Sequence, residues 1–268
     1  APDTAPPVAE APPALRGRVL VVDDVADLRR LLRLRVEATG AHVVEAGDGE
    51  TALARLREGG IDLVLLDMHM PGMDGRETVR RLRAAGERLP VYACSADVLP
   101  EDVAAFLAEG CDGALAKPVE TAALHAVLAR HLAAAGPGAR PASPATAPPA
   151  VTAAPASGGT GPAADPLAQA LAAIRARFVA GVAGERARLA EAFRQQDFDA
   201  LRQQAHRLKG SAGTFGFAGV SEAAAALETA VTDPGAVTHA DLAARVAALD
   251  SQLAALDCTD PAGTPAPA

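Results

Sequence analysis

The sequence has few of the residues that build aromatic cores or disulfide frameworks. It has no tryptophan, one tyrosine, six phenylalanines and three cysteines in 268 residues. The cysteines, Cys94, Cys111 and Cys258, are odd in number and form no CxxC pair, which argues against a disulfide framework and against a thiolate zinc site. A reducing compartment fits this usage best, and we expect a cytoplasmic location.

Long apolar runs and clustered positive charge are also scarce. We find no run that approaches the length of a bilayer span, and APDTAPPVAEAPPALRG at the N-terminus lacks the basic and apolar regions of a signal peptide. The net charge of -8 disfavours non-specific binding to nucleic-acid phosphates. Arg29, Arg30, Arg33 and Arg35 are expected to form a solvated helix face. We therefore expect no nucleic-acid partner and no membrane contact of this chain, although a membrane-anchored parent protein is compatible with this.

A glycine-rich nucleotide loop is missing too. GDGETALARLREGG is interpreted as a helix bounded by turns, and ASGGTG falls in a linker. This chain alone is therefore not expected to use ATP, and whether it is an enzyme stays open.

Composition divides the chain into two predicted domains. Residues 134–164 are rich in proline, alanine and glycine and poor in charge and large apolar groups, so they are expected to form a flexible linker. Residues 1–16 are a similar lead-in, which suggests sequence upstream and hence a fragment, and residues 258–268 form a tail. The two predicted domains are residues 17–133 and 165–257.

The first domain alternates short apolar runs with longer amphipathic ones five times. The apolar runs, such as RVLVV and IDLVLL, are continuous, as expected for parallel strands covered by helices on both faces. The pattern predicts an α/β fold with a doubly wound, five-stranded parallel sheet, whose functional site lies at the carboxyl ends of the strands. The second domain contains helical patterns alone, which predicts an all-α up-and-down bundle of four or five helices.

Charged and polar residues gather at the predicted carboxyl ends of the strands. Asp23 and Asp24 follow the first run, Asp67 the third, Ser95 the fourth and Lys117 the fifth. Two carboxylates about 4 Å apart repel by about 4 kcal/mol at an effective dielectric near 20, so the cluster needs positive charge. Lys117 and a bound Mg²⁺ would supply it. Each aspartate taken alone could equally cap the next helix, but all of them together favour the metal site.

Such a site suits phosphoryl chemistry. A carboxylate beside Mg²⁺ and a lysine can attack phosphorus and form an acyl phosphate. The serine hydroxyl at position 95 could then turn toward the phosphate and convert the covalent state into a loop movement.

These motifs, DD at 23–24, LLDMHMPGMDG around Asp67, CSA with Ser95 and KP at 117–118, together resemble a response-regulator receiver domain. The resemblance implies a flavodoxin-like fold and assigns roles to six residues. Asp67 would be the phosphoacceptor, Asp24 a Mg²⁺ ligand with Asp23 in support, His69 a ligand through its backbone carbonyl, Ser95 the switch hydroxyl and Lys117 the phosphate clamp.

Two further points depend on the resemblance. It implies a tight turn at the Lys117–Pro118 bond, which is therefore a candidate cis peptide. Receiver domains usually carry an aromatic residue three positions before the lysine, and this chain has Ala114 there. The aromatic half of the switch is therefore missing, which puts a large output-driving change in doubt and leaves the acceptor chemistry untouched.

The second domain has one candidate site, on the helix containing QQAHRLKGSAGTFGF. Leu201, Ala205 and Leu208 share the inward face, so His206 is expected to be exposed. Gly210 and Gly213 lie on the same stripe, where each glycine costs about 1 kcal/mol relative to alanine, which suggests close approach by another surface. An exposed histidine alone is more often without a role.

HRLKGSAGTFG resembles the phosphohistidine helix of histidine-containing phosphotransfer (HPt) domains. The resemblance implies that His206 is a phosphoacceptor, with Lys209, Gly210 and Ser211 at supporting positions. The other histidines show no ligand spacing and receive no role.

Together the two resemblances imply a phosphorelay in the C-terminal part of a hybrid sensor histidine kinase. Asp67 would accept a phosphoryl group from a kinase histidine in a Mg²⁺-dependent step and pass it to His206, which would pass it to a separate response regulator. An alternative is a binding module in which phosphorylation of the receiver controls access to the bundle. A metal-dependent hydrolase is a third possibility, but the cap and acid/base elements it needs are not evident between residues 67 and 117.

Overall fold

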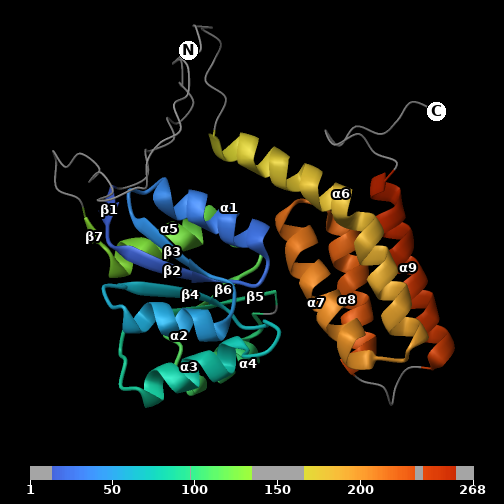
Figure 1. Ribbon diagram of the computed structural model, residues 1–268, viewed down its shortest axis with the longest axis horizontal. Helices are drawn as coiled ribbons and strands as arrows, with labels where there is room; N and C mark the ends of the chain where they lie inside the picture. The colour runs from blue at the N-terminus through green and yellow to red at the C-terminus, as the bar shows by residue number, and fades with distance from the viewer. Residues whose placement is uncertain (1–13, 97, 135–165, 233–237, 258–268) are drawn as a thin grey trace, which may run out of the picture.

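The computed structural model describes residues 14–96, 98–134, 166–232 and 238–257. Residues 14–134 form an α/β domain and residues 166–257 a helical bundle beside it (Figure 1). Residues 135–164 of the predicted linker, the predicted tail and the lead-in up to residue 13 lie outside the described residues.

Five parallel strands form the sheet of the α/β domain, in the order β3-β2-β4-β5-β6. Their bounds are β2 Arg18–Val22, β3 His42–Ala46, β4 Leu63–Asp67, β5 Val91–Ser95 and β6 Gly113–Ala116. All five residues of β4 and of β5 are buried, as expected for strands covered on both faces. The doubly wound sheet predicted from the sequence is confirmed.

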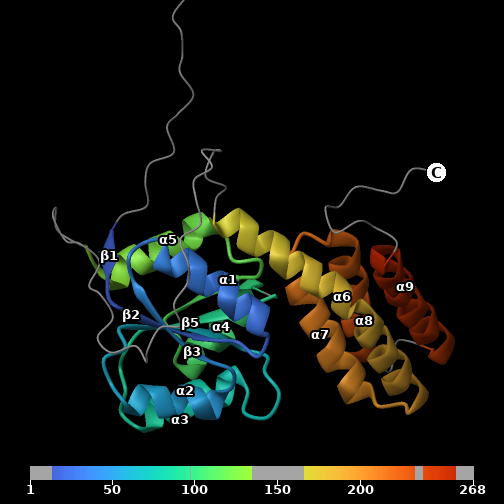
Figure 2. The ribbon, with the colours of Figure 1, turned by 45° about the horizontal axis from the view of Figure 1, so that its top comes forward.

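The described residues of this domain form five helices, and helices cover both faces of the sheet (Figures 1 and 2). Helices α1 (Ala26–Glu37) and α5 (Thr121–His131) pack on one face around a core that includes Val19, Val21, Leu32 and Leu128. On the other face, Leu20, Leu66, Val79 and Phe106 belong to a second core. The helices on that face are α2 (Gly49–Arg57), α3 (Gly75–Ala84) and α4 (Pro100–Glu109).

A two-stranded sheet joins the ends of the α/β domain. Strand β1 (Leu15–Arg16) pairs antiparallel with β7 (Ala133–Ala134), and Leu15 is buried in the core under α1 and α5. The sequence did not indicate these strands, because two-residue segments show no alternation and alanine is a weak strand former.

Four helices form the bundle within residues 166–232 and 238–257. They are α6 (Pro166–Arg194), α7 (Phe198–Thr214), α8 (Ala218–Thr232) and α9 (His239–Asp257). Their core contains Val182, Leu201, Leu208, Leu227 and Leu249. The fold class predicted for the second domain, an all-α bundle, is confirmed.

The sequence predicts four or five helices for the bundle, and the described residues form four, of which α6 is the longest. It is continuous over 29 residues. Gly181 lies inside this helix. No atom lies within 4 Å of the position that a Cβ would take there, so no close packing requires a glycine. A glycine in a helix interior is unfavourable but tolerated.

Aspartates begin three of the helices as side-chain caps. The carboxylates of Asp48, Asp74 and Asp197 accept hydrogen bonds from the backbone N–H groups of Thr51, Glu77 and Ala200 at 2.7, 2.7 and 2.9 Å. Such caps satisfy backbone donors that have no partner within the first helical turn. The last of them fixes the start of α7, the helix that carries His206.

The first part of α6 leaves the bundle and lies along α1 of the α/β domain (Figure 2). Leu28 and Leu31 of α1 form one buried cluster with Ile174 of α6 and Phe215, which follows α7. The Arg177 guanidinium on α6 also pairs with the carboxylate of Asp27 on α1. The two domains are therefore docked through an apolar contact edged by an ion pair.

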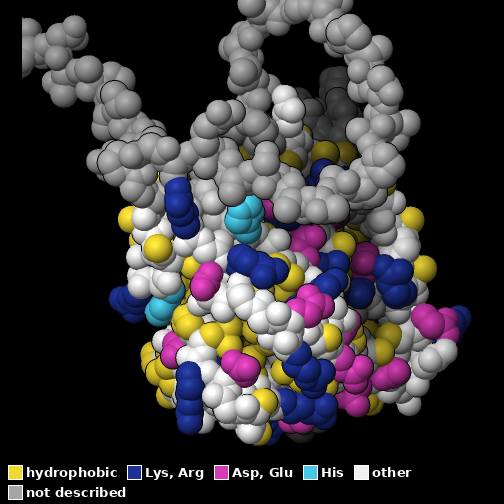
Figure 3. All heavy atoms as spheres, turned by 60° about the vertical axis from the view of Figure 1, so that its left-hand side comes forward, with side chains coloured by type: hydrophobic (Ala, Val, Ile, Leu, Met, Phe, Trp, Pro, Cys, Tyr) yellow, Lys and Arg dark blue, Asp and Glu magenta, His cyan; other side chains and the backbone are white. Residues whose placement is uncertain are grey.

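Charges of both signs are interspersed on the face of the molecule shown in Figure 3. Of the four arginines of α1, Arg30 and Arg33 are exposed as expected. Arg29 and Arg35 instead donate to the backbone carbonyls of Asp23 and Val119. The expectation of a wholly solvated arginine face is therefore wrong for these two, which brace the loops around the strand ends.

One described helix is long and apolar enough, by length and composition, to cross a membrane. It is the segment Leu167–Arg194 of α6, with a mean hydropathy of 1.3 over an 18-residue window, 11% of which is buried. The expectation that no run reaches this length is therefore wrong by this criterion. A single such helix is weak evidence for a span, and Ile174, Val182 and Leu189 of this helix are packed against other parts of the chain.

The two cysteines among the described residues, Cys94 and Cys111, are free and buried. Burial raises the pKa of Cys94 to about 12 and that of Cys111 to about 11. Both thiols are therefore neutral near pH 7, which makes them poor nucleophiles.

Candidate functional site

The carboxylates expected at the sheet edge lie close together. Asp23 and Asp24 follow β2 and Asp67 ends β4, the neighbouring strand in the sheet. One carboxylate oxygen from each of the three lies within 4.8 Å of the others. Parallel strands end at the same edge of a sheet, which is why residues 44 positions apart meet here.

Lys117 holds two of the three carboxylates. Its ammonium nitrogen lies 2.8 Å from Asp23 Oδ2 and 2.7 Å from Asp67 Oδ2. Burial alone would lower the pKa of Lys117, but the two carboxylates and their hydrogen bonds outweigh burial and raise it. The lysine is therefore charged at any physiological pH, and it is the partner that the buried Asp67 needs.

One ammonium group cannot balance three carboxylates. Burial is the largest cause that raises the pKa of Asp23, to about 6, and the charge of Asp67 adds to it. Burial and Asp67 also raise the pKa of Asp24. A cluster of carboxylate oxygens with excess negative charge is the ligand set that a hard divalent cation prefers. The three aspartates therefore fit Mg²⁺, and a cation there would lower these pKa values.

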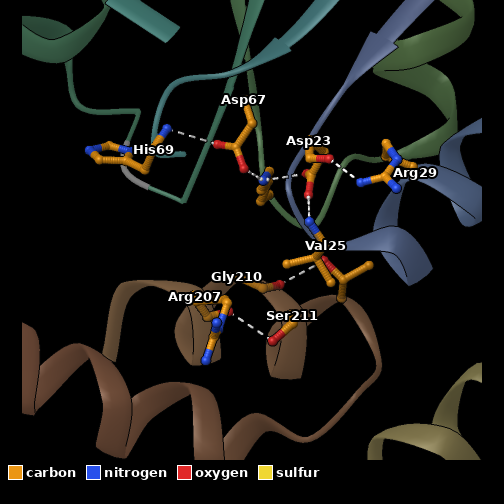
Figure 4. Close-up of polar contacts among 10 residues, drawn as sticks. Asp23, Val25, Arg29, Asp67, His69, Arg207, Gly210 and Ser211 are labelled. Atoms are coloured by element: carbon orange, nitrogen blue, oxygen red, sulfur yellow. Dashed lines mark hydrogen bonds and ion pairs between the residues drawn. The ribbon is translucent and has the colours of Figure 1, made fainter. Parts of the chain in front are cut away.

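Backbone groups fix the direction of these carboxylates. The N–H of His69 donates to Asp67 Oδ1 at 3.1 Å, and the N–H of Val25 donates to Asp23 Oδ1 at 2.8 Å. Figure 4 shows Asp23 and Asp67 side by side above α7. Each carboxylate thus has one oxygen on a backbone donor and the other on the lysine.

Gly75, at the start of α3, allows the loop after Asp67 to close tightly. A Cβ there would lie 2.4 Å from the Asp67 carbonyl oxygen and 2.6 Å from Met68 Cα. No side chain fits in that space without moving the backbone. The sequence analysis did not single out this glycine, although the PGMDG motif contains it.

Ser95 and Lys117 lie on neighbouring strand ends. Ser95 is buried at the end of β5, and its carbonyl accepts a hydrogen bond from the Lys117 backbone N–H at 2.7 Å. The Lys117–Pro118 peptide bond is cis, which confirms the expectation for this turn. Ala114 lies on β6, half-buried against the core under α2, α3 and α4.

His206 lies on α7, but it is not exposed as the sequence predicted. Its side chain is 13% exposed, and its Nδ1 lies 2.6 Å from Glu228 Oε1 on α8. Its ring centroid lies 3.8 Å from that of His69 of the α/β domain. The helical periodicity placed His206 off the bundle core correctly, but it could not show that the α/β domain covers this face.

Glu228 is a site residue that the sequence analysis missed. It holds His206 through one carboxylate oxygen and the Lys209 ammonium, at 3.2 Å, through the other. Burial alone would raise the pKa of Glu228, but His206 and Lys209 outweigh it and lower the pKa. An ionised carboxylate can only accept, so Nδ1 of His206 donates this hydrogen bond, and in the neutral ring Nε2 is the nitrogen that carries the lone pair.

The glycine stripe on α7 meets the other domain. A Cβ at Gly210 would lie 3.7 Å from Cδ of Lys117, whereas one at Gly213 would lie 3.1 Å from Oγ of Ser221 on α8. The close approach expected from the sequence is thus found at both glycines, to the α/β domain at Gly210 and within the bundle at Gly213. Ser211 is buried, and its hydroxyl donates to the Arg207 carbonyl at 2.8 Å (Figure 4).

Comparison with known proteins assigns both domains to families. The family model of the response regulator receiver domain matches residues 19–129, and that of the Hpt domain matches residues 173–258. The two-component response regulator ORR41 of Oryza sativa subsp. japonica is 42% identical over 117 residues, which cover 42% of this chain and 92% of ORR41. The chain belongs to the response-regulator receiver family, and an HPt domain follows its receiver domain.

Two further relatives match part of this chain. The sensor histidine kinase RcsC of Salmonella typhi is 41% identical over 111 residues, and the matched region spans 41% of this chain and only 12% of that kinase. The chemotaxis protein CheY4 of Vibrio cholerae has a solved structure that is 30% identical and covers 44% of this chain and 99% of CheY4, with a TM-score of 0.42. The matches to the receiver and HPt families place this chain in two-component phosphorelay signalling.

The docked receiver and HPt domains leave a cleft of about 650 Å³ between them. It is lined by Asp24, His69 and Arg76 of the receiver and by His206 and Arg207 of the HPt domain. The Arg207 charge opposes the upward shift in the pKa of Asp24. The candidate metal ligand and the candidate phosphoacceptor histidine therefore face the same solvent-connected space.

His69 connects the two sites. Burial, together with the neighbouring His206, lowers the pKa of His69 to about 4. Its ring is therefore neutral near pH 7 and can lie against His206 without repulsion between two imidazolium ions. The sequence analysis gave His69 a role through its backbone carbonyl only, and this ring contact is additional.

Proposed function

We propose that this chain relays a phosphoryl group from a kinase histidine to Asp67, from Asp67 to His206, and from His206 to a separate response regulator. One observation carries the proposal. The His206 ring lies on His69, two residues from Asp67, and Gly210, one helical turn from His206, lies against Lys117. The donor and acceptor of the internal step therefore lie in adjoining parts of one interface.

Asp67 would act first, as a nucleophile. Its carboxylate oxygen attacks the phosphorus of the donor phosphohistidine, the new P–O bond forms, and the P–N bond breaks so that the imidazole leaves with the electron pair. The Lys117 ammonium, 2.7 Å from Asp67 Oδ2, offsets charge on the phosphoryl oxygens. Asp23, Asp24, Asp67 and the His69 carbonyl would hold Mg²⁺, which when bound neutralises developing charge on phosphoryl oxygens.

His206 would act second. Glu228 accepts the hydrogen bond from Nδ1, so in the neutral ring the lone pair of Nε2 attacks the phosphorus of the Asp67 acyl phosphate. The P–N bond forms, the P–O bond breaks, and the Asp67 carboxylate leaves with the electron pair and returns to Lys117. Glu228 offsets the positive charge that develops on the imidazole.

The partners follow from this order. We propose a histidine kinase upstream, in the parent chain or in a separate protein, and a response-regulator receiver downstream. The parent would be a hybrid sensor histidine kinase, and we propose the cytoplasm for these domains. The matches to RcsC support this assignment, although they cover a small part of those kinases.

A second candidate function is supported by the cover over His206. Its side chain is 13% exposed while the receiver is docked, so the receiver could gate access of other proteins to the HPt domain. Ala114, where the aromatic half of the switch is missing, favours the relay instead. Measuring the accessibility of His206 before and after beryllofluoride binding at Asp67 separates the two, because gating predicts a change and a relay alone predicts little.

The relay is tested with a labelled kinase donor, this chain and a downstream receiver. With Mg²⁺ present, label should reach the downstream receiver through the wild-type chain. His206→Ala should retain label on Asp67 and pass none onward, and a chelator should abolish labelling of Asp67. Downstream labelling at the wild-type rate through His206→Ala would contradict the proposal.

A further inference from the structure

The α6 arm, defined here as residues 167–178, is a part of the HPt helix that reaches the receiver. Its first residues precede the region matched by the HPt family model, which begins at residue 173. In Figures 1 and 2 this stretch leaves the other bundle helices and runs along α1. The arm is therefore placed to serve docking more than the bundle core.

The arm carries an apolar ridge that the receiver covers. Ile174 is 0% exposed, and it shares a buried cluster with Leu28 and Leu31, which are 5% and 2% exposed. Leu171 of the arm and Val25 of the receiver pack against this cluster. Leu28 and Leu31 belong to neither of the two cores of the receiver. The arm and its neighbours in the HPt domain therefore supply much of the burial of these two side chains.

An ion pair at the edge of this contact joins α6 to α1 and fixes their relative position. The Arg177 guanidinium reaches the Asp27 carboxylate with two nitrogens, and Asp27 directly precedes Leu28 in the sequence. Charges at the edge of an apolar contact fix orientation and select partners more than they add affinity. The receiver surface that the arm contacts is thus about one turn of α1. It consists of an acidic residue at position 27 and apolar residues at positions 28 and 31, with two residues between the apolar ones.

We propose that the α6 arm is a docking element that recognises α1 of the chain's own receiver and thereby holds His206 under Asp67. A separate receiver must displace α1 from the arm before it reaches His206, so its own first helix must present the pattern of Asp27, Leu28 and Leu31. The consequence for transfer rests on the proposed function, whereas the docking itself does not.

Labelling of His206 in the full chain tests the docking without any phosphoryl group. Diethyl pyrocarbonate modifies accessible imidazoles, and mass spectrometry reports the rate at each histidine. Ile174→Asp places a charge in the apolar contact and should raise the labelling rate of His206 at least fivefold. Exposed His42 serves as the internal reference, and Ala173→Asp, on the exposed side of the arm, should leave the rate unchanged.

A variant in the other domain guards against unfolding of the bundle. Leu28→Asp changes only the receiver side of the contact and should raise labelling of His206 to the same extent. If circular dichroism shows folded proteins and neither variant changes the rate, or if Ala173→Asp raises it equally, the proposal is wrong.

Charge reversal tests the recognition by Asp27 and Arg177. A surface pair contributes up to about a fivefold change in an equilibrium constant, so Asp27→Arg and Arg177→Asp should each raise labelling two- to fivefold. The double variant restores opposite charges and should return toward the wild-type rate. If the fold-increase in the labelling rate of His206 in the double variant equals the product of the fold-increases in the two single variants, the pair has no role in recognition.

Discussion

The amine of Lys117 provides one positive charge against the three carboxylates of Asp23, Asp24 and Asp67. At the residue scale, this imbalance is the main electrostatic property of the receiver site. It leaves the two aspartates after β2 with raised pKa values and creates the demand for a cation.

The raised pKa of Asp23 predicts how stability depends on pH. Its pKa is raised from 3.8, the ordinary value of an aspartate, to about 6 in the folded chain, so between about pH 4 and pH 6 the folded protein binds more protons than the unfolded chain. The free energy of unfolding therefore falls as pH rises through this window. Urea midpoints of the wild type in a chelator should show this fall, and Asp23→Asn should show a smaller one. Equal slopes would contradict the assignment.

Glu228 predicts a separate effect on the HPt side. Removing a hydrogen bond to a charged group costs about 1.5–3 kcal/mol, so Glu228→Ala should slow transfer to His206 by roughly tenfold to a hundredfold. Phosphorylation of Asp67 by the kinase should stay unchanged, because Glu228 belongs to the other domain. Single-turnover transfer with Glu222→Ala, an exposed position on the same helix, is the control. Wild-type transfer in Glu228→Ala would disprove its positioning role.

The sequence pointed to the candidate acceptor residues more readily than to the groups that orient them. Asp67 and His206 were identified within short motifs whose residues are contiguous. Glu228 lies 22 positions from His206, on the next helix, and in SEAAAALETAV its only sequence signal is an acidic residue in an alanine-rich stretch. Pairing across helices depends on their rotation and spacing, which periodicity does not provide.

At the scale of secondary-structure elements, α7 brings the HPt site against the receiver site, whereas α6 packs on α1. Asp197 caps the start of α7, the leucines of α7 pack in the bundle core, and Gly210 is buried on this helix. Gly210 lies where α7 faces Lys117, so the size of the side chain at this position controls the distance between the two sites.

Two substitutions at Gly210 should have opposite effects. Gly210→Ala places Cβ 3.7 Å from Lys117 Cδ, an ordinary contact, and it should stabilise α7 by up to about 1 kcal/mol with near-normal transfer. Gly210→Leu should displace the lysine or the domain and slow transfer from Asp67 at least tenfold. Thermal melting and transfer rates of the two variants measure both effects. Equal transfer rates in the two variants would show that the approach is not close.

The elements themselves were mostly predictable. Five continuous apolar runs gave the five parallel strands, and helical periodicity gave the bundle. Where the sequence analysis failed, the signal was weak. The number of bundle helices was left at four or five, and β1 and β7 are only two residues long.

At the scale of the whole molecule, docking brings the receiver and HPt sites into one interface. No property of either domain alone predicts the 3.8 Å contact between the rings of His69 and His206. The expected exposure of His206 was wrong for this reason, because amphipathic patterning shows which face avoids the bundle core and does not show which other domain covers it.

Docking within one chain predicts first-order transfer. The rate of label movement from Asp67 to His206 should be independent of protein concentration, because a tethered partner has an effective concentration of order millimolar. A mixture of His206→Ala as donor and Asp67→Ala as acceptor at micromolar concentrations should transfer far more slowly, with a rate that rises with concentration. Equal rates in the mixture and in the wild type would contradict an intramolecular step.

The most direct test of the account is the order of phosphorylation. The wild-type chain and Asp67→Ala are incubated with a radiolabelled donor kinase and Mg²⁺, and the label on His206 is measured by gel autoradiography with site mapping. The account predicts label on His206 in the wild type and none in Asp67→Ala, because the aspartate supplies the phosphoryl group. Label on His206 at the wild-type level in Asp67→Ala would contradict it.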